Sequence, residues 1–129
     1  MILKRVVSGP GVPKSSSPLS QAVVAEGKFV FVSGQVGKDP ATGALPEDFI
    51  EQARQALANL KRVLEEVGAG PQDVVRMLVF VTDLSKGQEF NRLYGEFFGN
   101  EFPTRTRVQV AALSPGYQIE MEAIAVLPS

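Results

Sequence analysis

The sequence predicts an α/β fold in which two helices cover one face of a mixed β-sheet. Two observations predict it. Segments with strand-like patterning occur at both ends of the 129-residue chain, and helical and strand-like segments alternate between them in the overall order β-β-β-α-β-α-β-β. Two helices are too few to cover both faces of such a sheet, so one face is left without helices. No internal repeat or long linker divides the chain, and we expect a single domain over residues 1–129.

The N-terminal part of the chain predicts three strands. Residues 2–7 form the first, and the Pro-, Gly- and Ser-rich loop at residues 8–20 follows it. Because this loop lies between strands rather than at a free end, we expect it to pack against the domain. Residues 22–25 and 29–36 are the next two strands, and Glu-Gly-Lys at residues 26–28 predicts that they pair as a hairpin.

Two helices and a buried strand are predicted in the middle of the chain. Residues 46–67 place one apolar stripe on a helix, with Pro46 in its first turn and Gly68 as its C-terminal cap. Residues 74–82 are continuously apolar, as in a buried strand. The second helix covers residues 86–98, and the side chains that we expect it to bury are Phe90, Leu93, Tyr94, Phe97 and Phe98.

Charged and apolar residues alternate in two predicted strands within residues 102–126. Arg105 and Arg107 share one face of the first strand, and Glu120 and Glu122 share one face of the second. The Ser-Pro-Gly turn signal at residues 114–116 predicts that the two strands pair as a hairpin, which would place the charged faces together. Such charges are costly to bury in an apolar sheet unless they are paired or used, so we expect the functional site here.

The composition excludes several kinds of site and partner. The chain has no cysteine and no histidine, so a thiolate nucleophile, a Ser-His-Asp triad and a histidine-bound metal are impossible, and we expect neither metal nor cofactor. The net charge of −1 predicts no nucleic-acid or anionic-membrane partner. No apolar segment approaches the roughly 18 residues of a membrane helix, and residues 1–7 lack the features of a secretory signal. We therefore expect a cytoplasmic protein.

Apolar side chains occupy both faces of several predicted strands. Phe29 and Phe31 alternate with Val30 and Val32, although helices can cover only one of these two faces. An exposed apolar sheet face is typical of a protein–protein interface. We therefore expect a homo-oligomer in which the uncovered faces meet and the functional sites lie between subunits.

Seven segments along the chain resemble, in the same order, the Rid/YjgF family, whose members are also known as L-PSP endoribonucleases or translation inhibitors. The resemblance implies a chorismate-mutase-like α/β fold and a homotrimer with three clefts between subunits. For the enzymatic branch of the family it implies cofactor-free deamination of 2-imino acids. The segments are PLSQA at residues 18–22, FVSGQ at 31–35, QARQALANL at 52–60, VFVTD at 79–83, NRLYGEFF at 91–98, FPTR at 102–105 and IEMEAIA at 119–125.

The same resemblance implies roles for individual residues. Arg105 matches the family arginine that grips the substrate carboxylate, and Glu120 matches the acidic residue that places or activates water. Ser33 and Gly34 match residues that line the pocket, and Asn91 matches an asparagine contributed at the cleft.

Two departures from the family pattern fall at substrate-binding positions. Leu19 stands where the family frequently has tyrosine, and Arg107 stands where many deaminases have cysteine. Both bear on substrate preference and catalytic rate. Arg107 is either a structural residue or a charge that tunes substrate choice, and a second cation near the cleft would favour larger or dianionic imino acids.

Each assigned residue also has a purely structural interpretation. Arg105 could be held in an ion pair by Glu120 or Glu122, and Glu120 could equally be the counter-ion of Arg107. Ser-Gly at a strand end is often only a bulge or turn, and an asparagine early in a helix is often simply exposed.

Three functions remain open from the sequence. The leading one is deamination of 2-iminobutanoate or 2-iminopropanoate by a homotrimer. The second is a non-catalytic trimer whose clefts bind small carboxylates such as 2-oxo acids. The third is RNA cleavage or translational inhibition, which the slight negative charge, the absence of histidine and the lack of an aromatic and basic surface disfavour.

Overall fold

The computed structural model describes residues 1–129 and confirms an α/β fold with two helices on one face of a mixed sheet. Two short 3-10 helices span Pro71–Asp73 and Leu84–Lys86. The main elements are β1 (Ile2–Val6), β2 (Ala22–Ala25), β3 (Lys28–Val36), α1 (Phe49–Glu66), β4 (Val74–Val81), α2 (Gly87–Phe98), β5 (Thr104–Gln109) and β6 (Ile119–Leu127).

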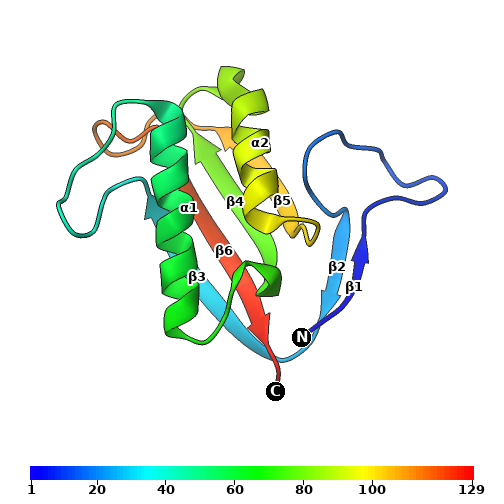
Figure 1. The fold of residues 1–129 in the computed structure, drawn as a ribbon. Helices are drawn as coiled ribbons and strands as arrows, with labels where there is room; N and C mark the ends of the chain where they lie inside the picture. The colour runs from blue at the N-terminus through cyan, green and yellow to red at the C-terminus, as the bar shows by residue number, and fades with distance from the viewer.

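Four of the strands form the sheet beneath the helices, in the order β3-β6-β4-β5. β4 and β5 are parallel, whereas β6 is antiparallel to both β3 and β4. Figure 1 shows α1 and α2 side by side across one face of this sheet. The opposite face carries no helix and is called the open face below.

The predicted hairpin between residues 22–25 and 29–36 is wrong. β2 pairs with β1 as a separate two-stranded ribbon, which lies to one side of the sheet in Figure 1. β3 has nine residues and finds an equally long partner in β6, whereas the four residues of β2 match the short β1. Arg5 ties the ribbon to the domain by donating hydrogen bonds to the carbonyls of Phe102 (2.6 Å) and Gln72 (2.9 Å).

The predicted C-terminal hairpin is also wrong, because β4 lies between β5 and β6. The turn at residues 114–116 belongs to a longer crossover that carries the chain past β4. Arg105 lies beside Met77, which is buried against the helices, whereas Glu120 lies beside Phe80 on the open face. Neighbouring residues on adjacent strands point to the same side, so the arginines and the glutamates face opposite sides of the sheet.

One hydrophobic core fills the space between the helices and the sheet. The predicted stripe of α1 is buried there, except that Val67 lies just beyond the helix end and is exposed. Asp48 caps the N-terminus by accepting a hydrogen bond from the Glu51 amide (3.1 Å), so the helix begins after Pro46 rather than at it. Gly68, at φ +78°, ends it as predicted.

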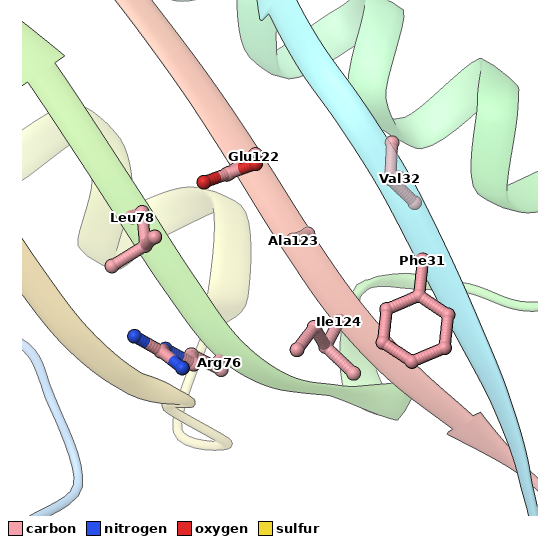
Figure 2. Close-up of a pocket in the computed structure, with 7 residues that line it drawn as sticks. All are labelled: Phe31, Val32, Arg76, Leu78, Glu122, Ala123 and Ile124. Atoms are coloured by element: carbon pink, nitrogen blue, oxygen red, sulfur yellow. The ribbon is translucent and has the colours of Figure 1, made fainter.

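The open face exposes a contiguous apolar surface. Phe29 and Phe31 are 61% and 76% exposed. Figure 2 shows Phe31, Leu78 and Ile124 on this face around a shallow hollow of about 200 Å³. Side chains of this size normally lie inside a protein, so the surface has the character of an interface. No helix of the protein combines the length and hydropathy that crossing a membrane requires.

Candidate functional site in two halves

The predicted site residues fall into two groups in this structure. We call Arg105, Arg107, Asn91 and Leu19 the arginine cluster, because they gather where β5 meets α2 and the loop before β2. We call Ser33, Gly34 and Glu120 the glutamate cluster, because they gather on the open face where β3 meets β6.

Arg105 is the centre of the arginine cluster. It is half-buried, and its Nη1 donates a hydrogen bond of 2.8 Å to Oδ1 of Asn91 on α2. Its Cζ lies 5.0 Å from the centroid of the Tyr94 ring and 5.7 Å from that of Phe90. These contacts fix a planar cation against two aromatic rings, an arrangement that is favourable when the cation is partly desolvated.

Arg107 occupies the next position on the same face of β5. Its Cζ also lies 5.7 Å from the Phe90 centroid. Gly87, the first residue of α2, makes room for it, because a Cβ at that position would lie 2.7 Å from Nη2 of Arg107. The two-residue period of β5 and the three-to-four-residue period of α2 therefore bring both arginines against one helix face.

Neither arginine has a carboxylate partner. The two side-chain ion pairs of the chain, Arg54 with Glu51 and Arg62 with Glu66, both lie along α1. The interpretation of Arg105 as a structural ion pair with Glu120 or Glu122 is therefore wrong within one chain. Burial lowers the pKa of Arg105, Tyr94 opposes this change, and Arg107 adds to it. Arginine nevertheless stays protonated in proteins, so the cluster keeps its positive charge.

The loop before β2 forms the outer wall of the arginine cluster. Leu19 and Arg105 both line a hollow of about 300 Å³. Leu19 and Asn91 line an adjoining hollow of about 490 Å³, and Nδ2 of Asn91 donates to Oγ of Ser17 at 3.4 Å. Buried Ser20 anchors this wall, since its Oγ donates a 2.6 Å hydrogen bond to the carbonyl of Phe102. Asn91 is therefore a bridge between Arg105 and the loop rather than a free surface residue.

The glutamate cluster is built on an irregularity in the sheet. The register of β3 and β6 shifts between Val32 and Gln35, so Ser33 and Gly34 form a bulge, as the structural interpretation of this pair predicted. A Cβ on Gly34 would lie 2.6 Å from Oε2 of Glu120. Glycine therefore lets the Glu120 carboxylate lie directly against the backbone. Ser33 is exposed beside it.

The structure does not bring the two clusters together within one chain. The arginine cluster faces α2, whereas Glu120 faces away from the helices on the open face. Arg105 and Glu120, the predicted catalytic pair, therefore cannot contact the same small molecule in one copy. The hollow of Figure 2 contains neither of them.

Sequence reasoning missed the groups that hold Arg105 in place. Phe90 and Tyr94 were predicted only as core residues, and helical periodicity alone cannot show that their rings also receive a guanidinium. The Tyr94 hydroxyl is buried without a hydrogen-bond partner, and burial raises its pKa, so it stays neutral. Ser17 and Ser20 lie in a loop whose composition indicates irregular structure and nothing more.

The arrangement suits a small organic anion rather than a metal ion. No three carboxylate, histidine or cysteine side chains come together in a group that could hold a metal. A half-buried guanidinium without a counter-ion, beside a hollow, can instead bind a carboxylate through two parallel hydrogen bonds. The Glu120 carboxylate on the other face can accept a proton from water.

Comparisons with known proteins agree on one family. The family model described as Endoribonuclease L-PSP matches residues 11–127. A RutC family protein of Pyrococcus abyssi is 42% identical over 123 residues, which cover 95% of this chain and 96% of that protein. The 2-iminobutanoate/2-iminopropanoate deaminase of Capra hircus is 38% identical over 126 residues, which cover 97% and 91%. The crystal structure of E. coli TdcF with bound serine is 38% identical, covers 96% and 99%, and superposes with a TM-score of 0.74.

Proposed function

The chain belongs to the Endoribonuclease L-PSP family, also called the Rid/YjgF family, and from this premise we propose that it hydrolyses 2-imino acids to 2-oxo acids and ammonia. Small imino acids such as 2-iminobutanoate and 2-iminopropanoate are substrates, and no cofactor takes part. One observation carries the proposal. The half-buried guanidinium of Arg105 has no carboxylate partner and lies beside a hollow large enough for a small acid.

Arg105 binds the carboxylate of the imino acid. Asn91 and the rings beneath the guanidinium leave part of its donor fork for a ligand, since Nη1 alone is bonded within the chain. Each charge-assisted hydrogen bond to the substrate is worth roughly 1.5–3 kcal/mol. A related protein, TdcF, has been crystallised with serine, a small acid with the carboxylate that this site would take.

The chemistry needs little more than orientation and a water molecule. Water attacks C2 of the imino acid, so a C–O bond forms and the C=N double bond becomes a single bond. The resulting carbinolamine expels ammonia as the C–N bond breaks and the C=O bond forms, and both protons of the water end on the nitrogen. Glu120 takes one proton from the attacking water and returns it to the leaving nitrogen. Ser33 and the open backbone at Gly34 hold the water in place.

The complete site takes its two halves from two copies of the chain. The arginine cluster and the glutamate cluster face opposite sides of the sheet, so a substrate cannot touch both in one copy. Association of a second copy with the apolar open face around Phe31 is favourable, because burying this face removes large apolar side chains from water. In a homotrimer, which the family resemblance implies, Glu120 of one copy meets Arg105 of the next at each of three seams.

A coupled assay tests the proposed function. Threonine dehydratase generates 2-iminobutanoate in place, and semicarbazide traps whatever the protein has not yet hydrolysed. We expect wild-type protein to lower the rate of semicarbazone formation. The deaminase activity should fall at least about 100-fold in Arg105→Ala and at least about 10-fold in Glu120→Gln. Arg62→Gln is the matched control, because Arg62 pairs with Glu66 on the exposed side of α1.

The trapping assay, together with calorimetry and a ribonuclease assay on the same variants, distinguishes the competing functions. Wild-type protein that leaves trapping unchanged, yet binds 2-oxobutanoate in calorimetry, is a carboxylate-binding protein and not a deaminase. A ribonuclease activity that is lost in Arg105→Ala and retained in Arg62→Gln would support the third function instead. Deamination that survives Arg105→Ala would contradict the site.

A further inference from the structure

Arg107 has no task in the hydrolysis of an imino acid with a single carboxylate. Arg105 binds that carboxylate and Glu120 activates the water. Arg107 nevertheless lies on the same face of β5, against the same Phe90 ring, with its guanidinium fitted into the space that Gly87 leaves free. Because Arg107 lies this close to Arg105, its charge should affect which substrates the site accepts.

Positive charge accumulates along this side of the site. Lys86 Nζ lies 6.0 Å from the centroid of Phe49, Arg107 lies over Phe90, and Arg105 lies over Phe90 and Tyr94. The N-terminus of the 12-residue helix α2, at Gly87, adds its own partial positive charge beside Arg107. Three cations and a helix N-terminus therefore lie along one row of aromatic rings.

The nearby acidic residues form no ion pair with Arg105 or Arg107. Glu89 lines a groove on the outer side of the helices together with Arg54 and Arg92. The Asp83 carboxylate accepts a hydrogen bond from the amide of Ser85 at 2.9 Å, and this bond together with the nearby charge of Lys86 lowers its pKa. Asp83 therefore offsets part of the Lys86 charge, although it forms no ion pair. Glu120 and Glu122 lie on the opposite face of the sheet. Lys86 is exposed, whereas Arg105 and Arg107 are half-buried and have no counter-ion. Two such cations side by side favour an anion with more than one negative charge.

We propose that this deaminase acts preferentially on 2-imino dicarboxylic acids, with Arg105 on the carboxylate next to the imine and Arg107 on the carboxylate at the far end. The proposal rests on the proposed function and specifies its substrate class. The reaction is unchanged at C2: 2-iminoglutarate and water give 2-oxoglutarate and ammonia, and the distal carboxylate keeps all its atoms. Arg107 is then a specificity-determining residue, because it contacts the substrate away from the reacting atoms.

Paired substrates test the role of Arg107. Glutamate oxidase with catalase supplies 2-iminoglutarate and threonine dehydratase supplies 2-iminobutanoate, both followed by semicarbazide trapping. We expect wild-type kcat/KM to be higher for 2-iminoglutarate. Arg107→Gln should lower that value roughly 10- to 100-fold and change the value for 2-iminobutanoate less than about threefold. Arg107→Lys should recover part of the loss, since it restores the charge without the planar fork. Arg62→Gln should change neither value.

A binding measurement separates failure of this inference from failure of the proposed function. Calorimetry gives the dissociation constants of 2-oxoglutarate and 2-oxobutanoate for wild type, Arg107→Gln and Arg62→Gln. If no imino acid is hydrolysed but 2-oxoglutarate still binds more tightly than 2-oxobutanoate through Arg107, deamination is refuted and the dianion site is supported. If 2-iminobutanoate is hydrolysed but Arg107→Gln affects both substrates equally, deamination stands and the dicarboxylate preference is refuted. Circular dichroism checks that each variant is folded.

Discussion

The arginine cluster and the glutamate cluster hold their charges in different ways. The guanidinium of Arg105 lies between a strand and a helix, bonded to Asn91 and stacked near Tyr94. The carboxylate of Glu120 lies over Gly34 at a sheet bulge, on a face that no helix covers, and forms no ion pair. One chain thus carries an anchored guanidinium on one side of the sheet and, on the opposite side, a carboxylate without an ionic partner.

This difference separates the part of the proposed site that one folded chain provides from the part that requires a second copy. The fold alone positions Arg105, the group that we propose binds substrate, and a displaced anchor would misplace the reacting carbon. Glu120, the group that we propose handles water, lies at the open face, and under the proposed function a second copy supplies its surroundings. Activity should therefore depend on assembly as strongly as on either charged residue.

Phe31→Glu gives the largest expected effect and tests this dependence. Phe31 is 76% exposed on the open face, on the edge strand β3, so a carboxylate there leaves the monomer folded but makes burial of that face unfavourable. We expect sedimentation to show a monomer, and deaminase activity to fall more than about 100-fold, although the arginine cluster is intact.

Val63→Glu is the matched control for Phe31→Glu. Val63 is also an exposed apolar residue, at 39%, but it lies on α1, away from the open face. It should keep both the oligomer and the activity. A fully active Phe31→Glu monomer would show that one chain completes the site by itself.

Gly34→Ala perturbs the glutamate cluster alone and should have an intermediate effect. The new Cβ would lie 2.6 Å from Oε2 of Glu120, so the carboxylate must move, and because it is the end of a flexible side chain the fold should tolerate the change. We expect kcat to fall about 10-fold with little change in KM, as for loss of a general base without loss of the carboxylate receptor.

Gly95→Ala provides the comparison for that glycine substitution. A Cβ at Gly95 would meet its nearest neighbour, in Pro18, at 3.8 Å, an ordinary contact, and Gly95 lies inside α2. Steady-state kinetics should be unchanged, and the free energy of unfolding should rise by about 0.5–1 kcal/mol.

If Gly34→Ala raises KM and leaves kcat unchanged, Glu120 binds substrate rather than activating water.

Tyr94→Phe should have the smallest effect. The ring beneath Arg105 stays in place, and the substitution removes a hydroxyl that is buried without a hydrogen-bond partner. We expect kcat/KM within about twofold of wild type, and a free energy of unfolding that is unchanged or higher by up to about 1 kcal/mol in urea titrations. A loss of activity beyond 10-fold would show that the hydroxyl, and not only the ring, takes part in the chemistry.

The sequence allowed the elements of this fold to be predicted, but not all of their pairings. The apolar stripe of α1 and the continuous apolar run of β4 are local patterns, and both were confirmed. The hairpins around residues 26–28 and 114–116 were wrong, because a turn signal shows where the chain bends and not which distant strand is the better partner.

The same limit explains which parts of the candidate site could be predicted. The two-residue period correctly placed Arg105 and Arg107 on one face of β5, and Glu120 and Glu122 on one face of β6. Whether the arginines and the glutamates point to the same side of the sheet depends on how β5 and β6 each pair with β4, which lies between these two strands. That pairing is a long-range property of the sheet. The contact of Phe90 and Tyr94 with Arg105 was not predicted, because a core residue and a cation-binding residue follow the same helical periodicity.

Mixing two impaired variants tests most directly whether each site is shared between copies. Arg105→Ala and Glu120→Gln are each purified, combined in equal amounts, unfolded and refolded together. If Arg105 of one copy works with Glu120 of the next, a trimer that contains both variants has one intact seam, and about a quarter of wild-type activity should return. A mixture that is no more active than the average of its two components, although mass spectrometry shows mixed oligomers, would contradict the shared site.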